Sequence, residues 1–156
     1  MTAHGPVPRR VVPPVTDGPA PCIVRELPLR VESVNQACEH YFARQRRHAT
    51  AHRVVRKALE GCARPALPVI VAMTRVARSE LDFDNWVGAA KPIRDAIADF
   101  IRLNDRDPRI DWVYLQEKRS EKVRLATWDG HGNQVGWRNA YRVFVRVEIW
   151  AGQGEP

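Results

Sequence analysis

One segment of this sequence is apolar on both sides of an extended chain. Between Leu67 and Val76, the alternating positions Val69, Val71 and Met73 are apolar, and so are Ile70 and Ala72 between them. A strand of this kind is covered on both faces in a folded protein. The chain must therefore surround it with helices and further strands, and a hydrophobic content of 44% is enough for one ordinary core.

The rest of the pattern supplies those elements. Apolar spacing predicts helices over about 37–61, ended by Gly61, and from Trp86 to Ile101, with Pro92 either in the first turn or at a kink. Alternation predicts strands over 22–31, 110–118 and 140–150. Trp128 to Asn139 contains three glycines and predicts a long hairpin loop. The order of elements predicts an α+β fold, a single domain with a mixed β-sheet covered by helices.

Composition sets the boundaries of that domain. Residues 1–21 hold six of the twelve prolines, which predicts an extended tail, either disordered or wrapped on a neighbouring subunit, before a domain over 22–156. Three widely spaced cysteines argue against a disulfide framework and a thiolate zinc site. There is neither an apolar run of about 18 residues nor a secretory signal, so we expect a soluble, cytoplasmic protein.

The charge is divided unevenly along the chain. The formal charge is +7, yet residues 82–111 hold seven of the nine aspartates and no glutamate. This window has a net charge of −2, and the remainder carries +9. Short carboxylates gathered in one place suit hard divalent cations, and basic surroundings suit a polyanionic substrate.

The longest basic stretch lies in the first predicted helix. Between Tyr41 and Ala58 there is no acidic residue, and the stretch carries Arg44, Arg46, Arg47, Arg53, Arg56 and Lys57. Solvated helix faces usually mix charges of both signs, so this stretch predicts contact with DNA or RNA phosphates. The alternatives are a solvated basic face and an arginine content that reflects genomic base composition.

The acidic window contains a possible metal site. Asp82 and Asp84 leave one face if the strand before them extends that far, and the turn around Asp105 and Asp107 is the natural source of a third carboxylate. Such a site would hold Mg²⁺ and activate a water, and Lys91 would stabilise the developing charge or protonate the leaving group. The alternative is that these aspartates cap the helix and form the turn.

The ordered string Asp82-Phe-Asp84-Asn85, then Lys91 and Asp95, then Asn104-Asp105 before a strand resembles the RusA family of Holliday-junction resolvases, especially its phage-encoded members. Asn35, His40 and the run Arg44 to Arg53 resemble the N-terminal part of the family more loosely.

The resemblance implies a homodimeric, Mg²⁺-dependent endonuclease, with Mn²⁺ as a substitute, that nicks four-way DNA junctions in the cytoplasm of a bacterial host. It needs no organic cofactor and no membrane. Asp82, Asp84 and Asp105 would bind the metal and Lys91 would be the catalytic lysine. The chain departs from the family pattern in about three extra residues before Lys91 and in Pro92 after it, and Asp107 competes with Asp105.

Three interpretations stay open. The chain is either a resolvase, a non-catalytic module that binds nucleic acid through residues 41–58, or a divergent metal nuclease with another branched or single-stranded substrate. His48 and His52 have a zinc-compatible spacing but no third ligand. Trp128 and Trp137 would either stack on bases or anchor the loop or a dimer interface.

Overall fold

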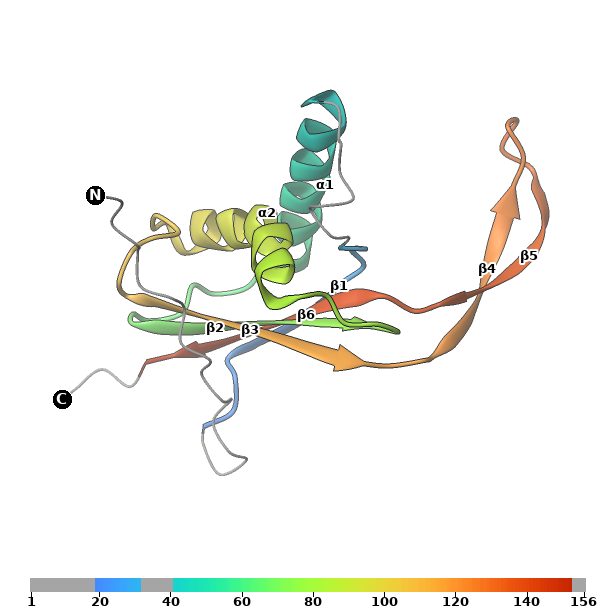
Figure 1. The fold of residues 1–156 in the computed structure, drawn as a ribbon. Coiled ribbons are helices and arrows are strands. Elements are labelled where there is room, and N and C mark those ends of the chain that lie inside the picture. Colours follow the sequence, from blue (N-terminus) through green and yellow to red (C-terminus); the bar gives the residue numbers. More distant parts are fainter. Residues whose placement is uncertain (1–18, 32–40, 153–156) are drawn as a thin grey trace, which may run out of the picture.

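The computed structural model describes residues 19–31 and 41–152. Most of the predicted tail over 1–21 therefore lies outside the described residues, and so do Asn35, Cys38 and His40. Figure 1 shows two helices on one side of a twisted sheet and a long hairpin that projects from the sheet. Neither helix of the described ranges combines the length and the apolar character that a membrane span requires.

The main sheet is mixed, as the order of elements predicted. Its four strands are β1 (Ile23–Leu27), β6 (Phe144–Ala151), β2 (Val69–Ala77) and β3 (Ile110–Lys118), in that order across the sheet. β2 is antiparallel to β6 and parallel to β3. The parallel pair is joined by α2 (Phe83–Ile101), which crosses over the sheet as such a connection requires. The predicted α+β class with a mixed sheet is confirmed.

The apolar residues of β2 account for its central place. Val71 and Met73 are fully buried and belong to the same core as Val147 and Ile149 of the neighbouring β6. Trp86 and Ile97 of α2 are fully buried in that core too. The two helices therefore cover one face of the sheet, and their shared core holds the start of α2 in place.

The first helix, α1 (Tyr41–Leu59), confirms only part of its predicted apolar face. Val55 and Leu59 are buried, and Gly61 ends the helix with a φ of 75° in the left-handed region. Phe42, by contrast, is 61% exposed. The N-terminal turns of α1 extend beyond the sheet (Figure 1).

Two local predictions need correction. Pro92 lies in the interior of α2, so the first-turn alternative is wrong. The stretch 128–139 is not one loop, because β4 (Lys122–Trp128) and β5 (Gln134–Tyr141) form a ribbon closed by a short turn. The last predicted strand is accordingly divided, and β6 begins only at Phe144.

Candidate nucleic-acid and cation site

The start of α2 carries the first two predicted site residues. Gln116 of β3 fixes the connection before it, since its side-chain amide donates to the Leu81 carbonyl and its oxygen accepts from the Leu81 N–H. Asp82 is the N-cap residue of α2, and Asp84 lies in the first turn. Both side chains are exposed. β2 ends at Ala77, so the strand does not extend to these residues and the two carboxylates do not leave one face of it.

The carboxylates of Asp82 and Asp84 are not used for capping. Asp82 makes no side-chain cap hydrogen bond, although its carbonyl accepts from Trp86 N at 2.9 Å. Neither side chain takes part in a hydrogen bond or ion pair among the described residues. The capping alternative therefore does not explain these two carboxylates, and both remain available to a ligand.

Lys91 lies on the same side of α2 as Asp84. Positions 84, 91 and 95 recur at one helical face, and Lys91 is two turns, about 10 Å, beyond Asp84. Its ammonium donates to both oxygens of Asp95 at 2.9 and 3.0 Å and lies 3.8 Å from Oδ2 of Asp105. Lys91 thus points toward Asp105 despite the proline that follows it.

Asp105 is held mainly by Arg94. The guanidinium donates to Asp105 Oδ2 at 2.7 Å and to the Tyr114 hydroxyl at 3.2 Å. The Asp105 side chain is only 15% exposed. Burial raises the pKa of Tyr114 above its usual value, while the Arg94 guanidinium opposes that shift, so the phenol stays protonated.

Tyr114 connects the two parts of the site. Its ring packs edge to face against Phe83 and Trp86 in the first turn of α2, with 6.4 Å between ring centroids in each case. The same residue receives the hydrogen bond from Arg94. Through Tyr114, the turn that carries Asp105 is tied to the helix start that carries Asp82 and Asp84.

Asp107 performs the structural task that the alternative interpretation assigned to both turn aspartates. Its carboxylate accepts from the backbone N–H of Arg109 at 3.0 Å and from the Arg109 guanidinium at 2.9 and 2.8 Å. These bonds lower the pKa of Asp107 to about 2. Asp105 is therefore the turn aspartate that faces Lys91, and Asp107 stabilises the turn.

The residues fit a divalent cation in part. Asp82 and Asp84 are unpartnered oxygen donors, and Mg²⁺ is commonly held by one or two carboxylates together with substrate phosphates. Within residues 19–31 and 41–152, however, no three His, Cys, Asp or Glu side chains are grouped for metal binding. To act as a third ligand, Asp105 would have to give up its hydrogen bond with Arg94 and bind the cation instead.

The basic helix lies beside this site. α1 packs against α2, and Arg44, Arg46, Arg53 and Lys57 are exposed, with Arg47 half-buried. The pKa of His48 is lowered by burial and by Arg44 and Arg47, and Asp95 on α2 opposes that effect. His48 of α1 is therefore close enough to the α2 face that carries Lys91 to feel the charge of Asp95.

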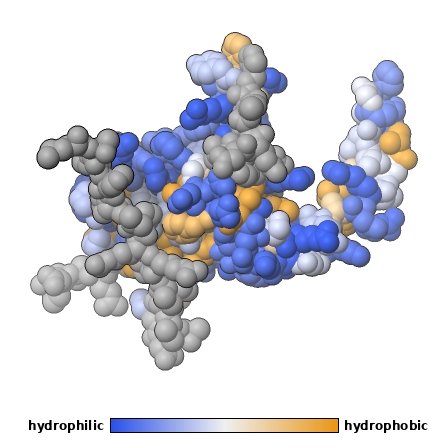
Figure 2. Space-filling view, in the orientation of Figure 1, coloured by the Kyte–Doolittle hydropathy of each residue, from blue (hydrophilic) through white to orange (hydrophobic). Residues whose placement is uncertain are grey.

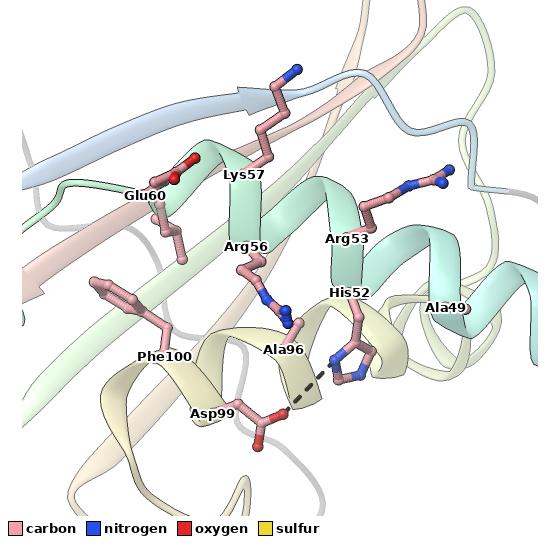
Figure 3. A pocket seen from close by; sticks show the side chains of 10 residues that line it. Ala49, His52, Arg53, Arg56, Lys57, Glu60, Ala96, Asp99 and Phe100 are labelled. Atoms are coloured by element: carbon pink, nitrogen blue, oxygen red, sulfur yellow. Dashed lines mark ion pairs between the residues drawn. The ribbon is translucent and has the colours of Figure 1, made fainter.

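A groove of about 910 Å³ separates the two helices further along. Figure 3 shows His52 and Arg56 extending toward α2, where Asp99 approaches His52 Nδ1 at 3.8 Å. The other cations that line the groove, Arg53 and Lys57, also belong to α1. Two carboxylates, Glu60 and Asp99, also line the groove, together with apolar side chains such as Phe100.

Sequence reasoning missed Arg94 and Tyr114. Arg94 follows Lys91 by three residues and so shares its side of α2, which is the signal that was available. Nothing in the alternation of β3 distinguishes Tyr114 from an ordinary core aromatic. Neither the known protein families nor the curated proteins compared with this chain match it.

Proposed function

We propose that this chain is a Mg²⁺-dependent, structure-selective DNA endonuclease of the RusA type that resolves Holliday junctions or other branched DNA. The supporting observation is the juxtaposition of two helices. α1 presents cations without acids, and the adjacent α2 begins with two carboxylates that have no partner among the described residues and carries Lys91 on the same side as Asp84. The DNA backbone would bind the basic surface of α1, and a phosphodiester bond would be hydrolysed at the carboxylates of α2.

Each residue has a distinct role in this proposal. Asp82 and Asp84 would hold Mg²⁺, and the bound cation supplies Lewis-acid polarisation of a phosphate oxygen. The Lys91 ammonium, which pairs with Asp95 and lies 3.8 Å from Asp105 Oδ2, would stabilise negative charge on the phosphate. Arg44, Arg46, Arg47, Arg53 and Lys57 would hold the DNA backbone.

The proposal includes a homodimer, because a two-fold symmetric enzyme matches the symmetry of a four-way junction without reading bases. It also places the protein in the cytoplasm of a bacterial host, as a phage or prophage product. Sedimentation of the full chain, with and without a synthetic junction, tests whether the protein is a homodimer.

The decisive experiment replaces the two unpartnered carboxylates. Asp82→Asn and Asp84→Asn should each lower Mg²⁺-dependent cleavage of a synthetic four-way junction by at least about 100-fold, since each removes a carboxylate charge that would hold the Mg²⁺. Binding of the same junction in Ca²⁺ should be unchanged. Asp107→Asn is the matched control and should cut normally, because Asp107 serves the turn.

A second candidate is a nucleic-acid-binding module without catalysis. The pairing of Asp105 with Arg94, where a third ligand was expected, favours it. This candidate predicts tight junction binding and no cleavage by the unaltered protein in Mg²⁺ or Mn²⁺. A panel of junction, fork and single-stranded substrates, each assayed for binding and for cutting, separates it from a nuclease with another substrate.

A further inference from the structure

The hairpin formed by β4 and β5 stands apart from the rest of the molecule. Figure 1 shows it projecting beyond the end of the sheet, and Figure 2 shows apolar residues exposed on it among hydrophilic ones. Among the described elements, its extensive contacts are those between its own two strands. A two-stranded ribbon is marginally stable alone, so its exposed side chains need a functional explanation.

Strand register divides these side chains between two faces. Lys122, Arg124 and Ala126 pair with Tyr141, Asn139 and Trp137, so all six point to one side of the ribbon. Trp128 follows in the same alternation of β4, since the extra residue of the adjoining bulge belongs to β5. We call Lys122, Arg124, Trp128, Trp137 and Tyr141 the aromatic face.

Cations and aromatic rings alternate on the aromatic face. The Arg124 guanidinium lies over the Trp137 ring, 5.4 Å from its centroid, and Arg78 lies 4.6 Å from the centroid of Tyr141. Trp128 and Trp137 nevertheless remain 61% and 58% exposed. Both indoles therefore present much of their surface to solvent, and the Arg124 guanidinium borders that of Trp137.

The only acid in the ribbon does not offset that charge. Asp129 lies in the turn, where its carboxylate accepts from the backbone N–H groups of His131 and Asn133. Gly132 provides the left-handed φ of 82° that this turn needs. The aromatic face itself thus contains cations and aromatic rings without a carboxylate.

We propose that the aromatic face binds unpaired bases of single-stranded nucleic acid, with Trp128 and Trp137 as stacking platforms and Arg124 and Lys122 against the phosphates. Aromatic rings interleaved with cations are the usual composition of such a surface. A second copy of this chain fits less well, because a two-fold contact would bring the same cations together.

The inference deepens the proposed function. It rests on that function only for the choice of DNA as the nucleic acid that is bound. At a branched DNA, the ribbon would engage bases exposed at the branch point, separately from the carboxylates of α2. The two proposals fail separately: the Asp82 and Asp84 variants change cutting and not binding, whereas variants of the aromatic face change binding.

The test measures fluorescence anisotropy of a labelled thymidine oligonucleotide of about 20 nucleotides with the full chain in Ca²⁺. Trp137→Leu and Trp128→Leu should each weaken binding about 5- to 150-fold, the equivalent of one lost base stack. Trp137→Phe should retain most of the affinity, because a phenyl ring still stacks. Leu125→Ala, an exposed position on the opposite face, is the matched control and should bind normally.

Two results would overturn the inference. One is equal affinity of the Trp→Leu variants and the unaltered protein for the oligonucleotide, with circular dichroism showing both folded. The other is a change from dimer to monomer in sedimentation caused by Trp128→Leu or Trp137→Leu, without loss of oligonucleotide affinity, which would identify a second copy as the occupant.

Discussion

Asp105 and Asp107 show how much two nearby residues of one type can differ. The sequence places both in a turn before a strand, and either could serve the turn or a site. In the structure, Asp107 accepts hydrogen bonds from Arg109 within the turn. Asp105 instead faces α2, where it contacts Arg94 and Lys91. The preference for Asp105 came from the resemblance, because local sequence cannot specify which carboxylate a distant helix will meet.

Arg94 provides a test at this scale. Arg94→Met removes the main partner of a carboxylate that is 15% exposed, so we expect a loss of about 1–3 kcal/mol in the free energy of unfolding. Urea denaturation at pH 7 measures it. Arg109→Met, which breaks a more exposed arginine–aspartate pair, is the control and should cost clearly less. Equal losses would contradict a special role for the Arg94–Asp105 pair.

At the scale of the elements, sequence patterns worked where one face is buried. Ile110–Lys118 was predicted with both ends correct, and the apolar spacing of α2 matches residues that are buried. The pattern failed for β5, whose residues are mostly exposed on both faces. A ribbon with no covered face gives no apolar alternation, so its glycines were interpreted as a loop.

The basic helix α1 has an expected signature in salt. Arg53 and Lys57 lie one turn apart and are exposed, so each should release about one counterion on binding DNA. The double variant Arg53→Gln/Lys57→Gln should lower the slope of log affinity against log salt by about 2. Binding of a junction measured across a salt series gives that slope.

Arg106, whose side chain has no ion pair among the described residues, supplies the comparison for α1. Arg106→Gln changes one exposed charge in the turn after α2, and its effect on the slope should be smaller than that of either α1 substitution. If the α1 double variant left the slope unchanged, the DNA would have to contact another surface.

Across the whole molecule, we expect the strands that are packed most tightly to resist local unfolding most strongly. β2 lies between β6 and β3 and is buried along its length, whereas β4 and β5 pair chiefly with each other. Amide hydrogen exchange should therefore be slowest in β2 and β6 and much faster in β4 and β5. Protection of the hairpin should rise when a single-stranded oligonucleotide is added.

An unchanged exchange rate in the hairpin at saturating oligonucleotide would argue against binding there. Equal protection of β2 and β4 in the free protein would show that the ribbon is stabilised by contacts outside the described residues. The sequence predicted the central place of β2 from its two apolar faces, but no local pattern indicated that a separate ribbon would extend from the sheet.

The position of β6 has a consequence for the order in which the fold can form. β6 lies between β1 and β2, pairing Ile149 with Ile23 and Val71, yet the ribosome makes it after all the other strands. Until it emerges, β1 has no neighbour and one edge of β2 is open. An apolar strand with an open edge pairs readily with other chains. The nascent protein is therefore most exposed to misassembly during the interval before Phe144–Ala151 leaves the ribosome.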